Sequence, residues 1–564
     1  MGLVLLATVF APAVGAALIW AVAEAGAVTA RRVALVTVLV TLALACYLIA
    51  QDPASNVEAN AVDIAWLARD AAGIDVRLSL GLDGLSLWFF GLSALLSFTA
   101  VLVSWQAIED RAPAFYALLL VLETGMLGVF AARDIILFYI FFEFTLIPLF
   151  FLIGIWGSQD RRYAAAKFFL YTFAGSVLTF LGLLALVFLD YHQQPVVQDV
   201  PRVLRFSISA LAAGLAERPI DQNLQLWIFL ALFAGFAIKV PLVPFHTWLP
   251  LAHVEAPSAG SVLLAGILLK VGTYGFVRFS LAMLPDAAAR CMPYILWLSV
   301  VGIVYGALVA LAQSDMKRLI AYSSVSHLGF CMLGVFALNR LGLEGGVLQM
   351  INHGLSTGGL FAIVGMLYER YHTREIRQLG GLAARTPWLA FLLVFFALSS
   401  IGLPGLNGFA GEFLLLLGVF QRGWAEAPAA WEAQLRVISV VAVSGVVLGA
   451  WYMLWLIERV LFGRLVEPEH HETDAPVRDA SPRDILALAP LAIFIVWIGV
   501  QPRFFLDRMR PALEPILARP AAALAADGEV DRAEQVGGSL RGLTPTAQRG
   551  NPVRPSSREL AHVD

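Results

Sequence analysis

Long runs of apolar residues recur along most of the chain and are separated by short polar breaks. A run of about 18 residues or more can cross roughly 30 Å of hydrocarbon as a helix, because each helical residue rises about 1.5 Å. The pattern therefore predicts an all-α polytopic membrane protein with about fourteen transmembrane helices. We place these helices at residues 2–23, 31–50, 84–105, 113–131, 134–156, 167–189, 224–252, 258–281, 290–311, 314–338, 343–369, 388–420, 435–462 and 484–501.

Two of these predicted helices carry residues that interrupt a helix. Pro241 and Pro244 follow Lys239, and each proline removes a backbone donor. The second interruption is the glycine-rich run 402–411, which contains Pro404 and ends just before Glu412. Broken helices in corresponding places of two halves are typical of transporters built from inverted repeats.

The rest of the pattern predicts three parts of the chain. Residues 1–83 hold two helices and a loop, whose alternating segment 74–80 predicts a short hairpin strand. Residues 84–501 form the main transmembrane domain. Residues 502–564 are polar, and we predict a disordered tail there. Lys and Arg are enriched in cytoplasmic loops, which places the loops around Arg161 and Lys317 inside and the N-terminus and the 51–83 loop outside.

Composition strengthens the membrane assignment and excludes several functions. Apolar residues make up 59% of the chain and the mean hydropathy is +0.78, whereas soluble domains are about 45–50% apolar even with glycine counted. The net charge of −3 gives no basic field for nucleic acid. The three cysteines stand singly in apolar runs, without the paired spacing of iron–sulfur or zinc sites. We therefore expect no cofactor or metal on this chain.

Four charged residues lie inside predicted helices, namely Glu143, Lys239, Lys270 and Glu412. A charge at the bilayer centre costs at least about 2.5–3.5 kcal/mol, so such residues usually mark ion paths. Each of them, taken alone, could instead form a structural ion pair. Their recurrence across successive helices favours a pathway. Glu123, also well inside its helix, could belong to the same set or pair with a neighbour.

Two histidines could join these charges. His327 and His353 each lie about ten residues into an apolar helix, and a neutral imidazole can both accept and donate a proton. They could link the lysines to Glu412, although a lone buried histidine is often only a satisfied core residue. His246 and His253 lie near the membrane edge, where each could be a helix-end contact or a group through which protons enter.

At these residues the chain resembles the antiporter-like subunits of respiratory complex I, the NADH:quinone oxidoreductase. The resemblance covers nearly all of residues 84–500, and it is carried by KVPLVPFHTWLPLAHVEAPSAGS at 239–261 with Lys270 after it, DMKRLIAYSSVSH at 315–327, and NHGLS at 352–356. Within that superfamily the chain is similar to the subunit M branch, the NADH dehydrogenase subunit 4 type. The L and N branches and the cation antiporters typically carry lysine where this chain has Glu412, and no long lateral helix of the subunit L kind is evident.

The resemblance implies a fold and a function. The expected fold has fourteen helices with two inverted five-helix repeats and two broken helices. The expected function is proton translocation in a bacterial inner membrane, coupled to electron transfer in partner subunits that hold NADH, FMN, iron–sulfur clusters and quinone. Subunit L-like and subunit N-like neighbours are implied. The resemblance also implies roles for these residues: Glu143 with Lys239 would be the coupling pair, Lys270 the connecting site and Glu412 the exit-side site.

Two other functions remain open at this point. The chain could be a subunit of a multi-chain sodium/proton antiporter that works without a redox partner. It could also be a scaffold whose buried charges only hold helices together.

Overall fold

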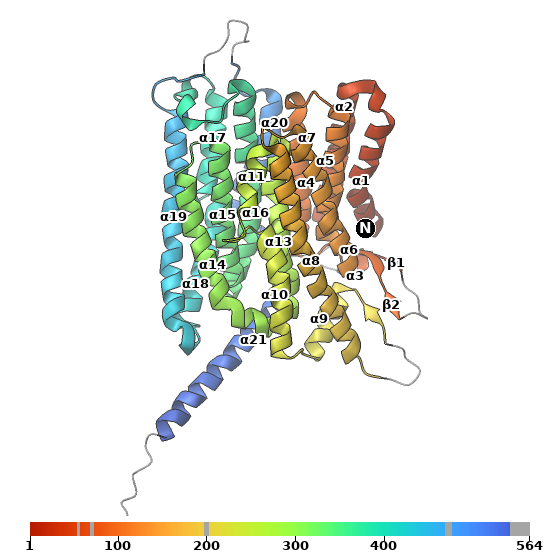
Figure 1. Cartoon of the computed structure of the whole chain (residues 1–564), viewed down its shortest axis with the longest axis vertical. Coiled ribbons are helices and arrows are strands. Elements are labelled where there is room, and N and C mark those ends of the chain that lie inside the picture. Colours follow the sequence, from red (N-terminus) through yellow and green to blue (C-terminus); the bar gives the residue numbers. More distant parts are fainter. Residues whose placement is uncertain (53–56, 68–72, 197–201, 469–476, 542–564) are drawn as a thin grey trace, which may run out of the picture.

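The computed structural model describes the chain except for residues 53–56, 68–72, 197–201, 469–476 and 542–564. Its helices run side by side in one bundle (Figure 1). Through the helix that follows the first predicted interruption they are α1 (Gly2–Ala21), η1 (Ala23–Ala25), α2 (Gly26–Ala50), α3 (Val57–Asn60), α4 (Leu87–Ala107), α5 (Ala112–Ala131), α6 (Ile135–Phe144), α7 (Leu146–Trp156), α8 (Arg161–Gln193), α9 (Ile208–Glu217), α10 (Gln222–Lys239) and α11 (Trp248–Glu255).

The second part of the bundle contains two π-helical segments, η4 and η5, besides its α-helices. Its elements are α12 (Ser258–Leu263), η4 (Leu264–Leu268), α13 (Leu269–Gly275), η5 (Phe276–Leu281), α14 (Pro285–Leu311), α15 (Met316–Val335), α16 (Arg340–Tyr371), η6 (Ile376–Gln378), η7 (Leu382–Ala384), α17 (Pro387–Ser400), α18 (Asn407–Trp424), η8 (Ala429–Trp431), α19 (Glu432–Leu461), α20 (Pro482–Val500) and α21 (Arg503–Arg541).

The prediction of an all-α polytopic membrane protein is confirmed. Twelve helices in the described part of the chain are long and apolar enough to cross a membrane. Helix α15 has 20 residues but carries several polar side chains, and α17 and α18 are two separate helices with residues 401–406 between them. The total of fourteen spans and the inverted repeats stay predictions.

Both predicted interruptions are present. Helix α10 ends at Lys239 and α11 begins at Trp248, with the two prolines between them. Helix α17 ends at Ser400 and α18 begins at Asn407. These breaks place Lys239 at a helix end and Glu412 in the first turns of α18.

A third interruption was not predicted. The expected single helix over 134–156 is divided at Thr145 into α6 and α7. Pro148 lies in the first turn of α7, where its ring and missing N–H prevent a continuous ladder of hydrogen bonds from α6. The break follows Glu143 by two residues, so it bears directly on the candidate site.

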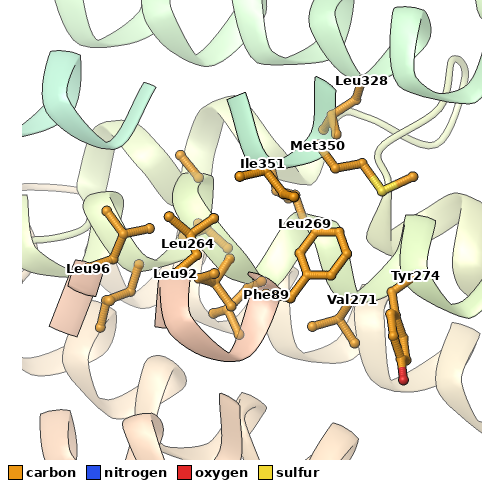
Figure 2. Packing of buried hydrophobic residues seen from close by; sticks show 14 of the residues in the cluster. Phe89, Leu92, Leu96, Leu264, Leu269, Val271, Tyr274, Leu328, Met350 and Ile351 are labelled. Carbon is orange, nitrogen blue, oxygen red and sulfur yellow. The ribbon is translucent and has the colours of Figure 1, made fainter. Parts of the chain in front are cut away.

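Apolar side chains fill the centre of the bundle, where α4, α13 and α16 meet (Figure 2). Phe89 of α4 stacks on Phe130 of α5, with ring centroids 5.2 Å apart, and Tyr274 of α13 packs edge-on against Phe130 at 5.2 Å. These side chains are 1% exposed or less. Most of the charged residues described below therefore lie inside a closely packed apolar core.

The end of the bundle predicted to lie outside carries the short strands and α21 (Figure 1). Strands β1 (Val62–Ala65) and β3 (Arg77–Leu80) pair antiparallel, as the alternation over 74–80 suggested. Strand β2 (Ile74–Asp75) pairs instead with β4 (Leu204–Arg205), in parallel.

The prediction of a disordered tail over 502–564 is wrong for residues 503–541, which form α21. Phe505, Met509, Leu513 and Ile516 recur at helical spacing and are at most 9% exposed, because this part of α21 packs against α14 and α16. The average composition of residues 502–564 is polar, so it did not indicate this short apolar stripe. The rest of the predicted tail, 542–564, lies outside the described residues.

An ion pair fixes the start of α4 to the helix that carries Lys270. The Arg278 guanidinium donates two hydrogen bonds to the Asp83 carboxylate, at 2.6 and 2.8 Å. Burial alone would raise the pKa of Asp83, but the paired guanidinium lowers it to about 2. The ionised form of Asp83 is therefore bound in the folded state.

This ion pair predicts a pH-dependent contribution to stability. Because the folded pKa lies below the ordinary value, the contribution is present above about pH 4 and is lost as the pH falls towards 2. We expect Asp83→Asn to lower the free energy of unfolding by about 1–2 kcal/mol near pH 7 and to have little effect near pH 2. Thermal unfolding in detergent at both pH values measures this.

The matched control is Asp63→Asn. Asp63 also pairs with an arginine, Arg77, but its side chain is 48% exposed, and such exposed pairs contribute little. Equal losses in the two variants, or a loss for Asp83→Asn that persists at low pH, contradict the prediction.

Candidate functional site

Lys270 lies at the centre of the site and is fully buried. It is the second residue of α13, between the π-helical segments η4 and η5. A π-helical segment has an extra residue in its turn, so some backbone carbonyl groups lose their regular α-helical hydrogen bonds. Such segments are frequent at functional sites. Here the Lys270 ammonium donates to the carbonyl of Ala265, which belongs to η4. The distorted helix thus provides a polar partner for a charge in an apolar core.

The second partner of Lys270 is His353 of α16. The lysine Nζ and the His353 Nδ1 are 2.6 Å apart. The two helices pass closely because glycines face each other beside this contact: a Cβ added to Gly354 would lie 2.6 Å from the carbonyl oxygen of Gly266. The glycines therefore allow the lysine and the histidine to meet directly.

The chain of ionisable groups continues from His353 to Glu412. The rings of His353 and His327 are 5.7 Å apart, and Nδ1 of His327 lies 3.3 Å from Oε1 of Glu412. That approach is not aligned as a hydrogen bond, whereas Gln349 donates to the same carboxylate oxygen at 2.9 Å. Each of these side chains is at most 5% exposed. Four of the predicted pathway residues therefore form one buried series from α13 to α18.

Glu143 and Lys239 form a second group beside the break at Thr145. The Phe142 carbonyl there accepts a hydrogen bond from the Thr145 hydroxyl at 2.9 Å and another from the Lys239 ammonium at 3.4 Å. The ammonium also lies 3.6 Å from the centre of the Phe142 ring. Glu143 acts on Lys239 electrostatically, yet its Oε1 is buried without a hydrogen-bond partner among the described residues.

The two groups are adjacent in the bundle. Helix α10, which ends at Lys239, crosses α13 at Gly272, two residues after Lys270. A Cβ added to Gly272 would lie 3.0 Å from Cβ of Lys239. The structure therefore brings all six predicted pathway residues into one neighbourhood that crosses both halves of the domain.

The two histidines at the membrane edge differ. His253 is fully buried, stacks on Phe361 at 4.5 Å, and has no hydrogen-bond partner on either ring nitrogen within the described residues. It interacts electrostatically with Lys270 and with Lys317. His246 packs its ring against Tyr305, 5.2 Å away, and against Tyr322. Only His253 is thus in electrostatic contact with the series.

Lys317 is a site residue that the sequence analysis missed, because it was counted only among the inside charges. It is 5% exposed, and its ammonium donates to the carbonyl of Ala256 at 2.5 Å. It lines a cavity of about 1130 Å³ at the end of the bundle that is predicted to lie inside, together with Glu255, Glu369 and Arg374. Lys317 is thus a buried ammonium group at the wall of a cavity that also has acidic and basic side chains in its lining.

Glu123 does not join either group. Its side chain is fully buried in α5, and neither carboxylate oxygen has a hydrogen-bond partner among the described residues. The interpretation that Glu123 pairs with a neighbour therefore does not hold.

The groups in this arrangement are chemically able to transfer protons. Lysine, histidine and glutamate each gain and lose a proton, and the contacts of 2.6 and 3.3 Å lie within or near hydrogen-bond range. Among the described residues, no three His, Cys, Asp or Glu side chains are grouped so that they could hold a metal ion. The buried series is thus a candidate proton path.

Comparisons with known proteins identify the family. Residues 132–434 match the family model described as NADH:quinone oxidoreductase/Mrp antiporter, transmembrane. The chain is 43% identical over 486 residues to NADH-quinone oxidoreductase subunit M of Rhodobacter capsulatus, which covers 86% of this chain and 90% of that protein. The chain belongs to the subunit M family. It is also 38% identical to the Escherichia coli subunit M over 514 residues, which cover 89% of this chain and 95% of that one.

A solved structure of a relative supports the family fold. A chain of respiratory complex I from Thermus thermophilus with bound NADH has 32% sequence identity and a TM-score of 0.77, and the match covers 92% of this chain and 99% of that chain. Subunit M membership favours the oxidoreductase interpretation over the sodium/proton antiporter. It also agrees with the presence of glutamate at position 412, the residue on which the sequence analysis based the choice of branch.

Proposed function

We propose that this chain is a membrane-arm subunit of NADH:quinone oxidoreductase that moves protons across the membrane, driven by electron transfer in other subunits. The observation that carries the proposal is the buried series from Lys270 through His353 and His327 to Glu412. Burying four ionisable groups is expensive, so their contact in one line is better explained by transport than by stability. In this proposal, NADH, FMN, iron–sulfur clusters and quinone are bound by partner subunits.

Protons enter from the inside cavity in this proposal. Lys317 lines that cavity, and His253 interacts electrostatically with both Lys317 and Lys270. A neutral imidazole with two unpartnered nitrogens can receive a proton on one and release it from the other. His253 therefore connects the cavity with Lys270. His246, which packs against tyrosine rings, would have a structural role.

Glu143 and Lys239 form the coupling pair. Helix α6 presents Ile140 and Phe144, 41% and 38% exposed, on both sides of Glu143, so Glu143 lies near a surface that lipid or a neighbouring subunit covers. A change of charge in that neighbour alters how strongly Glu143 attracts the Lys239 ammonium. Lys239 then passes the change to Lys270 across the close α10–α13 crossing. The neighbours would be subunit L-like and subunit N-like chains in a bacterial plasma membrane.

Replacement of the coupling pair tests the proposal. We expect Glu143→Gln or Lys239→Met, in the assembled complex, to reduce NADH-driven proton uptake into vesicles by about tenfold or more, because one charge of the pair is lost. NADH oxidation falls with it if the two processes are tightly coupled. The measurement is proton uptake and NADH oxidation in the same vesicles.

Glu458→Gln is the matched control, since Glu458 is exposed on α19 and far along the chain from the pair. It should leave both rates unchanged. Wild-type proton uptake and oxidation in both coupling variants would reject pumping through this chain.

A further inference from the structure

The histidine that contacts Glu412 is held on its other nitrogen by two hydroxyl groups. The Ser400 Oγ and the Tyr452 hydroxyl each lie 3.2 Å from Nε2 of His327. Both side chains are buried, 6% and 1% exposed. They come from elements far apart in the chain: Ser400 is the last residue of α17, at the break before α18, and Tyr452 belongs to α19.

This geometry determines which nitrogen faces the carboxylate. With Nε2 occupied by the hydroxyls, Nδ1 is the nitrogen that remains 3.3 Å from Glu412. A hydroxyl can accept a hydrogen bond from Nε2–H or donate one to an unprotonated Nε2. The two hydroxyls therefore hold the ring in one position through both protonation states of His327.

Tyr116 shows that a buried tyrosine in this chain can be satisfied without such a contact. Its hydroxyl donates to the backbone carbonyl of Ser104 at 3.0 Å, between α4 and α5. Tyr452 instead directs its hydroxyl at a ring nitrogen of the buried series. A buried tyrosine hydroxyl needs a hydrogen-bond partner, but that partner does not have to be an ionisable group.

We propose that Tyr452 and Ser400 are positioning residues that keep Nδ1 of His327 within 3.3 Å of Glu412, so that a small rotation of the carboxylate lets a proton pass between them. In this step the imidazolium N–H bond at Nδ1 breaks and an O–H bond forms at Oε1 of Glu412. The products are a neutral carboxylic acid and a neutral imidazole whose Nε2–H remains bound to the hydroxyl oxygens. The inference rests on the proposed function, because it assigns the last step of the same path.

Loss of the hydroxyls in the assembled complex tests the inference. Tyr452→Phe and Ser400→Ala each remove one oxygen with little change of shape, and the double variant frees the ring. We expect each single variant to slow NADH-driven proton uptake modestly and the double variant to slow it by about three- to tenfold, the order expected for lost hydrogen bonds. The pH profile of uptake should also move, which a purely structural role does not cause.

Three further variants make the result decisive. Tyr116→Phe removes a buried hydroxyl elsewhere and should leave the rate and the pH profile unchanged. Ser400→Thr keeps a hydroxyl and should retain most of the activity. Glu412→Gln distinguishes the two proposals: wild-type uptake in that variant overturns the proposed path itself.

A second outcome overturns only the positioning role. In that outcome Glu412→Gln has impaired uptake, while the double variant keeps wild-type uptake and an unchanged pH profile. If the double variant does not assemble, Tyr452→Phe alone decides, because phenylalanine fills the same space. An unchanged rate and pH profile in that variant then reject the role of Tyr452.

Discussion

Replacing Lys270 with methionine is expected to abolish proton translocation by this chain while the chain still folds and assembles. Methionine has nearly the same length and suits an apolar core, and the Lys270 side chain is fully buried. The variant therefore lacks a charge that is costly to bury, and the fold should not be weakened. The proposed path, however, loses the group that joins His253 to His353.

The size of the effect follows from the position of Lys270. Its ammonium contacts His353 at 2.6 Å, and its electrostatic interaction with His253 connects it to the inside cavity. Lys270 is the described lysine that contacts His353 directly, whereas the interaction of His253 with His353 is electrostatic only. A positioned acid or base contributes about 10²–10⁴-fold to a proton-transfer rate. We therefore expect NADH-driven proton uptake to fall at least about tenfold.

Lys167→Met is the matched control. Lys167 lies on α8 with its ammonium 6.0 Å from the centre of the Tyr163 ring, outside the buried series. Proton uptake into vesicles, divided by the amount of assembled complex, measures both variants. Uptake in Lys270→Met equal to that of Lys167→Met would show that protons bypass Lys270.

The sequence predicted the spans and the two paired interruptions because both depend on local chemistry. An apolar run of sufficient length must become a membrane helix, and a proline pair such as Pro241 and Pro244 must interrupt one. The break at Thr145 follows the same rule through Pro148. It was not predicted because one proline in a long apolar run is a weaker signal than a proline pair or a glycine-rich run.

Burial cost identified the charged members of the site, but the contacts between them depend on tertiary packing. Nothing local places His353 within 2.6 Å of Lys270; that distance requires the facing glycines of η4 and α16. The π-helical segments around Lys270 leave no sequence signal of their own. Lys317 was missed because it lies at the start of a helix, where a lysine is usually an exposed charge on the inside of the membrane.

The same distinction explains α21. The residues after 502 have a polar average composition, and that average predicted disorder. The helix forms because a narrow apolar stripe meets a matching surface on α14 and α16. Arg510 of α21 adds an ion pair to the buried Glu344 of α16, at 2.9 Å. A local average of composition could not predict a surface that is built from helices much earlier in the chain.

Glu412→Gln is expected to have the second large effect, with proton uptake again reduced at least about tenfold. Glutamine keeps the shape and can still pair with Gln349, which now donates to the Glu412 carboxylate at 2.9 Å. It cannot accept a proton from His327. The loss would therefore come from chemistry and not from packing, and the amount of assembled complex should stay at the wild-type level.

Glu412→Asp separates position from chemistry. Aspartate keeps the carboxyl group but shortens the side chain by one methylene, and Oε1 of Glu412 is already 3.3 Å from Nδ1 of His327. We expect intermediate uptake, because the proton must cross a longer gap. Glu432→Gln, which changes an exposed carboxylate paired with Arg436, should pump as the wild type does. Full activity in Glu412→Gln would overturn the proposed path, and uptake in the aspartate variant as low as in the glutamine variant would contradict the expected intermediate rate, because the carboxyl group alone would then not restore transfer.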